Sequence, residues 1–360
     1  MLRYALHDGR LTKTLSPQDP KSQIMKQVVT FGEIMMRLSP PLNYRFAQTR
    51  NLEITYGGGD ANVGASLAGL GVPAAHVTCF PDNDLGHAAA QQFRALGVNM
   101  DATVYEGDRL GLYFLEVGAG MRPSKVVYDR ANSAFAHLDP AKFNWDEILQ
   151  DAGWLHWTGI TPAISASTAE ATRQAIVAAR RLGLTVSADV NYRRNLWQYG
   201  QSAQAVMSEL VQGCDVVVCS ENDAEDLFGI VPEPDADNKF VSVAQQVMAR
   251  FPQIKQVITT RRNTHSASHN GLKGIYYDGQ QFLETVTHEI NPIVDRIGGG
   301  DAFMAGFIYG SLAYEHPQQA LNFGVAASAL KHTIPGDINL VTVAEVEEIM
   351  KGNTSGRLVR

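Results

Sequence analysis

The chain has 360 residues, of which 45% are hydrophobic and 19% are charged, and its formal net charge is −7. This length suits one large α/β domain with an appendage, or two domains. The acidic balance argues against a general nucleic-acid-binding protein, and the absence of any run of about 18 apolar residues argues against a membrane span. The three cysteines, Cys79, Cys214 and Cys219, lack the spacing of a metal or disulfide framework, so we expect free thiols in a cytoplasmic protein.

The beginning of the chain divides at its second methionine. The segment Met1 to Gln23 has no apolar signal core, whereas Met25 directly precedes the first clear strand, residues 27–31. We therefore expect residues 1–24 to form a disordered extension, residues 25–352 to form one folded domain, and residues 353–360 to form a tail.

A first glycine run follows a polar, aromatic excursion after Glu33. Gly57-Gly58-Gly59 opens a predicted helix over residues 61–70, which ends at Gly71. Glycine permits close approach of the backbone to a ligand. Asp60 and Asn62 lie in the first turn, where their residue types are those of helix caps, so the sequence alone leaves open whether they have a further role.

The next part of the chain predicts a small sheet. A strand at 75–80 and a helix at 87–96 are followed by alternating segments at 102–105, 111–117 and 125–128. Alternation with a period of two is typical of strands with one wetted face. Together with the earlier excursion, these segments predict a lid that draws its strands from about 33–57 and 100–130.

From residue 150 onward, strands and helices alternate. The predicted strands cover 154–158, 185–190, 215–219 and 256–260, and the predicted helices cover 167–182, 203–211, 222–228 and 241–251. Repeated βα units form a parallel sheet with helices on both faces, and ligands bind at the carboxyl ends of its strands. A hairpin at 274–286 and helices at 302–314, 318–331 and 343–350 complete the expected domain.

A second glycine run lies directly before the apolar helix at 302–314. The free N–H groups of Gly298, Gly299 and Gly300 and the helix dipole favour an anion there. Asp301 is either a helix cap or a general base, which takes a proton from a hydroxyl while the adjacent N–H groups hold the phosphoryl group under attack.

Two motifs carry a resemblance to a known family. Residues 295–301, DRIGGGD, resemble the C-terminal signature D-T-x-G-A-G-D of the ribokinase (PfkB) family of carbohydrate kinases, with Arg296 in place of Thr and Gly299 in place of Ala. The pattern G-G-x-x-x-N that ends at Asn62 resembles the N-terminal signature. The resemblance implies an α/β, ribokinase-like three-layer αβα sandwich with a mostly parallel central sheet and a small β-sheet lid.

Further runs, at 111–114, 122–134, 189–197 and 331–337, resemble the 2-keto-3-deoxygluconate kinases of this family. Two arginines and two tyrosines at strand ends or in the lid independently favour a sugar acid, because guanidinium groups form forked hydrogen bonds with carboxylates. The resemblance implies that the substrate contacts are Gly58, Gly59, Asp60, Asn62, Tyr113, Tyr128, Arg130, Asn191 and Arg193. Asp301 would deprotonate the 6-hydroxyl, and the backbone of residues 298–301 would stabilise the transferring phosphoryl group.

The resemblance also implies ATP and Mg²⁺ as cofactors, with nucleotide contacts at Ser220, Asp223, Thr260, Arg262, Ser266, Gly298 and Gly300. Many relatives carry a T-x-G turn where this chain has Arg261-Arg262-Asn263, and these arginines either bind phosphate or lie in solvent. Ser220 and Asp223 replace the family's N-x-x-E, so Asp223 or Glu221 serves Mg²⁺ through water, or this cluster only caps a helix. A monovalent cation such as K⁺ near Asp295 and Asp337 is a further implication of the family.

The sequence supports three alternative functions less well. A kinase of the same fold that acts on fructose, ribose or a nucleoside is the nearest alternative, and a catalytically silent sugar-acid sensor is another. A sensor has no need for the base Asp301. A dinucleotide oxidoreductase is excluded, because only Gly32-Glu33 follows the first strand. Exposed strand edges and apolar lid residues such as Phe46 and Phe114 predict a homo-oligomer built partly through the lids.

Overall fold

The computed structural model describes residues 5–7, 10–12, 25–354 and 356. Most of the expected disordered extension and part of the expected tail therefore lie outside the described residues. Within the extension, β1 (Ala5–His7) and β2 (Arg10–Thr12) pair antiparallel with each other. None of the described helices combines the length and the apolar character that crossing a membrane requires.

Within the described residues, nine strands form the central sheet. Its order is β16-β15-β14-β13-β12-β11-β3-β6, and β17 also pairs with β15. The six strands from β14 to β6 run parallel, whereas β15, β16 and β17 add antiparallel pairs at one side. The strands are β3 (Gln27–Phe31), β6 (Ala74–Val77), β11 (Ala152–Thr158), β12 (Thr185–Asp189), β13 (Val216–Val218), β14 (Gln256–Ser266), β15 (His269–Tyr277), β16 (Phe282–Glu284) and β17 (His288–Ile290).

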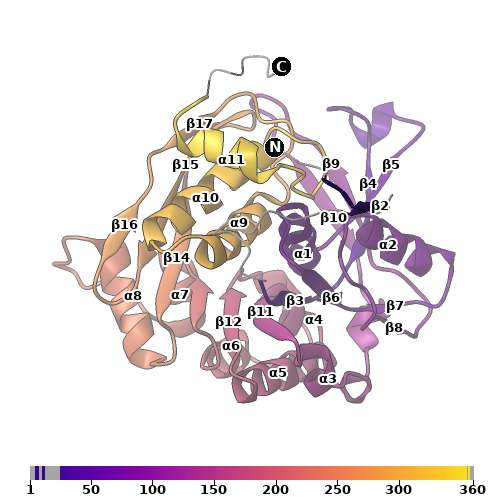
Figure 1. The fold of residues 1–360 in the computed structure, drawn as a ribbon, viewed down its shortest axis with the longest axis horizontal. Coiled ribbons are helices and arrows are strands. Elements are labelled where there is room, and N and C mark those ends of the chain that lie inside the picture. The colour runs from indigo at the N-terminus through magenta and orange to yellow at the C-terminus, as the bar shows by residue number, and fades with distance from the viewer. Residues whose placement is uncertain (1–4, 8–9, 13–24, 355, 357–360) are drawn as a thin grey trace.

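Helices cover both faces of this sheet (Figure 1). One face carries α1 (Gly59–Gly69), α9 (Gly299–Ala313), α10 (Pro317–Lys331) and, outside α10, α11 (Val343–Met350). The other carries α3 (Trp145–Leu149), α4 (Ile160–Ile164), α5 (Ala166–Arg181), α6 (Ala203–Val211), α7 (Glu221–Phe228) and α8 (Lys239–Arg250). Successive side chains of a strand point to opposite faces of the sheet, so each strand contributes to both cores. Val217 packs against one helical layer and its neighbour Val216 against the other. The predicted three-layer sandwich is confirmed.

A second sheet of four strands forms the lid. Its order is β10 (Lys125–Asp129), β9 (Leu112–Glu116), β4 (Met35–Ser39) and β5 (Glu53–Gly57). Helix α2 (Asp84–Ala95) packs beneath it together with α1, and β7 (Cys79–Phe80) pairs with β8 (Val104–Tyr105). The predicted small sheet is confirmed as part of the fold.

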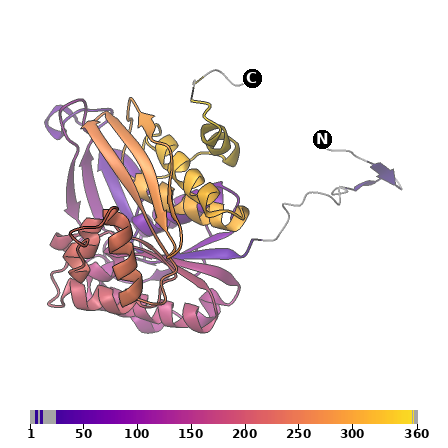
Figure 2. The same cartoon turned by 90° about the vertical axis from the view of Figure 1, so that its left-hand side faces the viewer.

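One predicted strand ends too early. The strand predicted at 256–260 continues in the structure through residues 261–263 to Ser266, as β14. Antiparallel pairing with β15, such as Arg261 with Lys273 and Arg262 with Leu272, satisfies the backbone of this exposed and polar extension. Figure 2 shows the resulting long hairpin rising beside the lid. Its bend touches the lid: Ala267 N donates to Gly120 O at 2.8 Å, and Gly120 N donates to Ser268 Oγ at 2.9 Å.

Helix α9 is apolar on nearly all sides and is correspondingly buried between α1 and α10. Its contact with α10 depends on small residues: a Cβ added to Gly306 would lie 2.8 Å from the Cα of Gly324. The residue before the helix, the N-cap Gly298, has a φ of +80°, the left-handed conformation that glycine tolerates best. Tight packing of the helix body therefore fixes the position of the glycine run at its start.

Candidate active site

The carboxyl ends of the parallel strands meet the starts of α1 and α9 at one edge of the sheet. There Asn62 Nδ2 in α1 donates a hydrogen bond to Asp301 Oδ2 in α9 at 2.7 Å, across 239 positions of sequence. Burial raises the pKa of Asp301 from 3.8 to about 6, and the Asn62 hydrogen bond opposes that rise. Asp301 is thus a carboxylate whose proton affinity suits a general base near neutral pH.

Asp60 does not cap α1 with its side chain. Its Oδ2 accepts hydrogen bonds from Thr158 at 3.0 Å and from Thr161 at 3.2 Å, whereas its buried Oδ1 has no partner among the described residues. Burial holds its pKa well above the usual range. A carboxyl group with an unused oxygen beside Asp301 is suited to hold a substrate hydroxyl.

The glycines of the first run bring α1 close to its neighbours. A Cβ on Gly58 would clash with the backbone oxygen of Glu33, and a Cβ on Gly59 would lie 3.7 Å from Asp301 Oδ1. Gly58 N donates a hydrogen bond to Asn62 Oδ1 at 3.3 Å. The first turn of α1 therefore faces the first turn of α9 with only small groups between them.

Arg193 and Asn191 follow the end of β12 at the same edge. The positive charge of Arg193 lowers the pKa values of Asp301 and Asp189, and its exposed side chain pairs with no carboxylate among the described residues. Asn191 has a φ of +38°, an uncommon conformation for a residue other than glycine. The turn after β12 therefore places the Arg193 guanidinium, which has no carboxylate partner in the described chain, near the site.

The lid contributes Arg130 and Tyr128. The Arg130 guanidinium pairs with buried Glu33, whose other oxygen accepts from Ser133 Oγ at 2.5 Å. It also lies 5.9 Å from the centre of the exposed Tyr128 ring, within cation–π range. Arg130 is therefore a fixed and partly neutralised cation, unlike Arg193.

Tyr113, a further expected substrate residue, lies on β9 of the lid. Its side chain is buried, and its hydroxyl donates to Asp337, which together with burial holds the tyrosine pKa well above its usual range. Asp337 and Asp295, the expected ligands of a monovalent cation, both pair with the Arg37 guanidinium, at 2.5 Å and 2.7 Å. These four side chains form a closed polar cluster beneath the site.

Two arginines lie on the other side of the anion hole. Arg262 is exposed on its strand, but partial desolvation by the surrounding protein and the charge of the neighbouring Arg296 lower its pKa. Burial, together with the charges of Arg262 and Arg296, lowers the pKa of His332 to about 4. Neither arginine has a carboxylate partner among the described residues. Arg296 donates to the Ala267 carbonyl at 3.1 Å. Close, unneutralised cations beside a helix N-terminus are suited to phosphate groups.

Most of the remaining expected nucleotide and metal residues have local partners. Ser220 and Asp223 form a capping box at the start of α7, with Ser220 Oγ 2.5 Å from Asp223 Oδ2, and Glu221 pairs with Arg261. Thr260 lies half-buried on β14, and Ser266 Oγ accepts from Ser268 N in the hairpin bend. A cavity of about 600 Å³ lies beside them rather than at Asp301, lined by residues that include Ser220, Glu221, Lys239 and Arg261.

The glycines of the second run differ in their surroundings. Gly298 lies against the Asp337 backbone, and an added Cβ on Gly299 would lie 2.6 Å from His332. Nothing within 4 Å would meet a Cβ on Gly300. Gly298 and Gly299 are therefore packed against neighbouring residues, whereas the space beside Gly300 is open, as a phosphoryl site requires.

Sequence reasoning missed several residues of this site. Asp189 ends β12, and burial, followed by the charges of Asp223 and Asp301, raises its pKa to about 7. Arg37 and Lys331 are buried cations that contact the loop before α9. A carboxylate at the end of a buried strand was the available signal for Asp189, whereas nothing local distinguishes Arg37.

The chain matches a model of the pfkB family of carbohydrate kinases over residues 25–343. It is 34% identical to a 2-dehydro-3-deoxygalactonokinase of Haloferax volcanii, over 92% of this chain and 98% of that protein, and 28% identical to a 2-dehydro-3-deoxygluconokinase of Bacillus subtilis, over 86% and 91%. The structure of a 2-dehydro-3-deoxygluconokinase from Thermotoga maritima superposes with a TM-score of 0.87 at 42% identity, covering 91% of this chain and 99% of that one. A fructokinase from Vibrio cholerae, solved with fructose, ADP and a potassium ion, shares the fold at 21% identity and a TM-score of 0.72.

Proposed function

This chain belongs to the pfkB family of carbohydrate kinases, and we propose that its acceptor is 2-keto-3-deoxygluconate, which it converts with ATP to 2-keto-3-deoxy-6-phosphogluconate. The observation that carries the proposal is the Asn62–Asp301 pair at the start of α9, where a carboxylate with a pKa of about 6 adjoins the anion hole. The names of the most similar relatives support the acceptor class.

In this mechanism Asp301 accepts the proton of the 6-hydroxyl as that oxygen attacks the γ-phosphorus of ATP. The bond from phosphorus to the β,γ-bridging oxygen breaks, and ADP leaves in line. The N–H groups of residues 298–300 receive the charge that develops on the phosphoryl oxygens. Asn62 keeps the acceptor oxygen of Asp301 oriented through its 2.7 Å hydrogen bond.

We assign Arg193 as the residue that binds the carboxylate of the substrate. Its exposed guanidinium influences Asp301 electrostatically but has no carboxylate partner among the described residues. A planar guanidinium binds a carboxylate in a forked arrangement. Arg130 and Tyr128 in the lid would close over the sugar, and the unused oxygen of Asp60 would accept one of its hydroxyls.

ATP is assigned to the edge formed by β13 and β14. Arg262 and Arg296 would contact its phosphates, because the two like charges lie close together without a carboxylate between them in the described chain. The cavity of about 600 Å³ beside Ser220 and Lys239 offers room for the nucleoside.

The donor groups also fit Mg²⁺. Asp189, Asp223 and Asp301 lie close enough for the latter two to raise the pKa of the first, and Mg²⁺ favours such carboxylate oxygens, often through water. We assign Asp189 and Asp223 as the groups that would hold it. When bound, Mg²⁺ would neutralise phosphate charge.

We further propose that the lids pair in a homo-oligomer. The edge strands β5 and β10 expose Ile54 and Val127, each more than half accessible, and exposed apolar sheet edges are usually covered. Light scattering of the wild type and of an Ile54→Lys, Val127→Lys variant tests this assignment. A monomeric wild type would overturn it.

The experiment that tests the function is a coupled ADP-release assay with 2-keto-3-deoxygluconate, 2-keto-3-deoxygalactonate, fructose, ribose and adenosine in parallel. We expect turnover with the keto-deoxy acids and its loss in Asp301→Asn. Preference for a neutral sugar would overturn the acceptor assignment but leave the chemistry standing. Tight binding without turnover of any acceptor would favour the sensor.

Arg193→Gln tests the carboxylate assignment, and Arg194→Gln is its matched control. Arg194 is the neighbouring arginine, but its side chain is 77% exposed and lies 3.4 Å from Asp226. Loss of a guanidinium–carboxylate contact would raise KM for the acid about 10–100-fold at unchanged KM for ATP. Equal effects of the two substitutions would remove Arg193 from the pocket.

A further inference from the structure

Lys331, the last residue of α10, has no exposed surface. Its ammonium donates to the Ile334 carbonyl at 3.1 Å and lies 3.5 Å from the Asp295 carbonyl. A lysine is rarely buried completely, because removing its charge from water is costly unless other groups compensate. This position therefore calls for an explanation.

Arg37 is a second buried cation beside it, 4% exposed. Its Nη2 lies 2.7 Å from Asp295 Oδ2, and its Nη1 lies 2.5 Å from Asp337 Oδ1. These contacts join residues 258 and 300 positions apart. Two cations and two carboxylates thus share one buried cluster.

The cluster occupies the place where family resemblance implies a free monovalent cation, near Asp295 and Asp337. The oxygens there already have partners. The Asp295 carboxylate also accepts from Ile297 N at 3.0 Å and from Gly336 N at 3.1 Å, and two backbone oxygens face Lys331. A free cation would lie against two fixed positive charges, which repel it strongly at such short range. These residues do not fit a bound K⁺.

The same contacts support the anion hole. Asp295 begins the loop that leads to Gly298, and a Cβ on Gly298 would lie 3.3 Å from Lys331 Cε. The charge of Lys331 also lowers the pKa of Asp301, against the larger effect of burial. We propose that Lys331, together with Arg37, is a tethered cation that positions the anion-hole loop, so that this kinase needs no free monovalent cation.

The turnover part of this proposal rests on the proposed function, so its test includes a readout that needs no substrate. Wild type, Lys331→Met and Lys273→Met are compared in tetramethylammonium chloride and in KCl at about 0.1 M. Lys273 is the matched control, because it lies in a surface ion pair with Glu284. Thermal unfolding and the coupled assay are measured for each.

We expect wild type and Lys273→Met to respond equally to both salts. Lys331→Met should lose about tenfold or more in kcat, recover with K⁺, and show a higher unfolding midpoint in K⁺. A wild type that K⁺ activates or stabilises would overturn the proposal, even if the variant failed to fold. If K⁺ restores the unfolding midpoint of Lys331→Met but none of the three proteins turns over substrate, the tethered-cation proposal stands and the kinase assignment is refuted.

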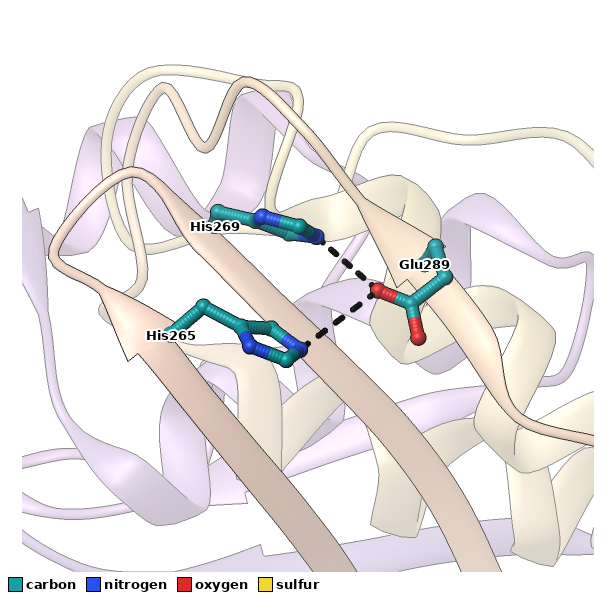
Figure 3. Close-up of side chains that lie close together, drawn as sticks. All are labelled: His265, His269 and Glu289. Carbon is teal, nitrogen blue, oxygen red and sulfur yellow. Dashed lines mark hydrogen bonds and ion pairs between the residues drawn. The ribbon is translucent and has the colours of Figure 1, made fainter.

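A separate observation concerns the bend of the β14–β15 hairpin. His265, His269 and Glu289 come from three neighbouring strands and face one another (Figure 3). His269 Nε2 lies 2.9 Å from Glu289 Oε2, His265 Nε2 lies 4.0 Å from the same oxygen, and all three candidate ligand atoms lie within 4.8 Å of one another. Strand pairing holds them, with Gly271 opposite Glu289.

Two imidazoles and one carboxylate are the protein ligands of an open zinc site. The geometry points to a surface site for a divalent transition metal of the Zn²⁺ type. The site straddles the bend whose residues 266–268 contact Gly120 in the lid and Arg296 before the anion hole. A bound metal would link the three strands next to these contacts.

Calorimetric titration with Zn²⁺ tests the site in the wild type, in His265→Ala and in His269→Ala. His137→Ala is the control, because His137 is a surface histidine bonded to Asn132 elsewhere in the chain. We expect each ligand substitution to weaken binding about tenfold or more, and the control to leave it unchanged. Equal affinity in all four proteins, or no binding to the wild type, would overturn the site.

Discussion

Replacing Asp301 with asparagine should abolish activity and stabilise the unliganded protein. Burial raises the pKa of this carboxyl from 3.8 to about 6. The difference corresponds to about 3 kcal/mol of unfolding free energy, an upper limit because the side chain keeps some contact with solvent. The carboxyl is protonated in both states below about pH 4. As pH rises from 3.8 through 6, the unfolded chain releases its proton first, and stability is lost.

Asparagine has no such titration. At pH 7 the variant should therefore unfold at a temperature up to about 4 °C higher than the wild type, whereas near pH 4 the two midpoints should converge. The loss of the base should reduce kcat by about 10²–10⁴-fold. Calorimetry at the two pH values and the coupled assay measure both effects.

Asp278→Asn is the contrasting control. Asp278 lies in the β15–β16 turn, where its Oδ1 accepts from Gln280 N and Gln281 N, and its pKa is lowered despite partial burial. Its substitution should destabilise the protein at pH 7 and leave kcat unchanged. Asp301→Asn with activity within tenfold of wild type, or equally destabilised at both pH values, would refute the reasoning about burial and the base.

Three further predictions concern neighbouring groups. Asn62→Ala removes the hydrogen bond that lowers the Asp301 pKa, so the acidic limb of the pH–kcat/KM profile should move to higher pH; an unchanged limb would exclude this coupling. Arg262→Gln should raise KM for ATP about tenfold or more with little change for the acceptor, as initial rates at varied ATP would show, and a change confined to the acceptor would contradict the phosphate assignment. Gly58→Ala places a Cβ against the Glu33 backbone and should displace the first turn of α1, which lowers the unfolding midpoint and kcat together; a stable and active variant would show that the loop can yield.

The layered fold was predictable because its strands and helices have strong and distinct periods. Residues 27–31, 203–211 and 343–350 form elements with the predicted bounds. The long β14–β15 hairpin was not predictable, because exposed residues such as Arg261 and Asn263 carry no apolar pattern. Their strand conformation depends on pairing with β15. Short helices such as α4 likewise depend on their surroundings.

The site was predictable only where residue types cluster in sequence. The two glycine runs indicated Asn62 and Asp301 separately, but not that one donates to the other. Arg37 lies in the segment predicted as an excursion after Glu33, and its role depends on Asp337, 300 positions away. The resemblance placed Tyr113 at the substrate, but its sequence position could not reveal that its hydroxyl donates to Asp337.

The sequence separation between Arg37 and its carboxylate partners has a consequence for synthesis on the ribosome. β3, near the start of the described domain, pairs with β6 and with the distant β11, and Arg37 receives its carboxylates only after residue 337 has emerged. Before Asp295 and α9 have emerged, the nascent chain holds a guanidinium without either counter-charge and an α1 without the helix that covers it. Such long-range closure is slow, so chains released before α10 should be inactive and prone to degradation.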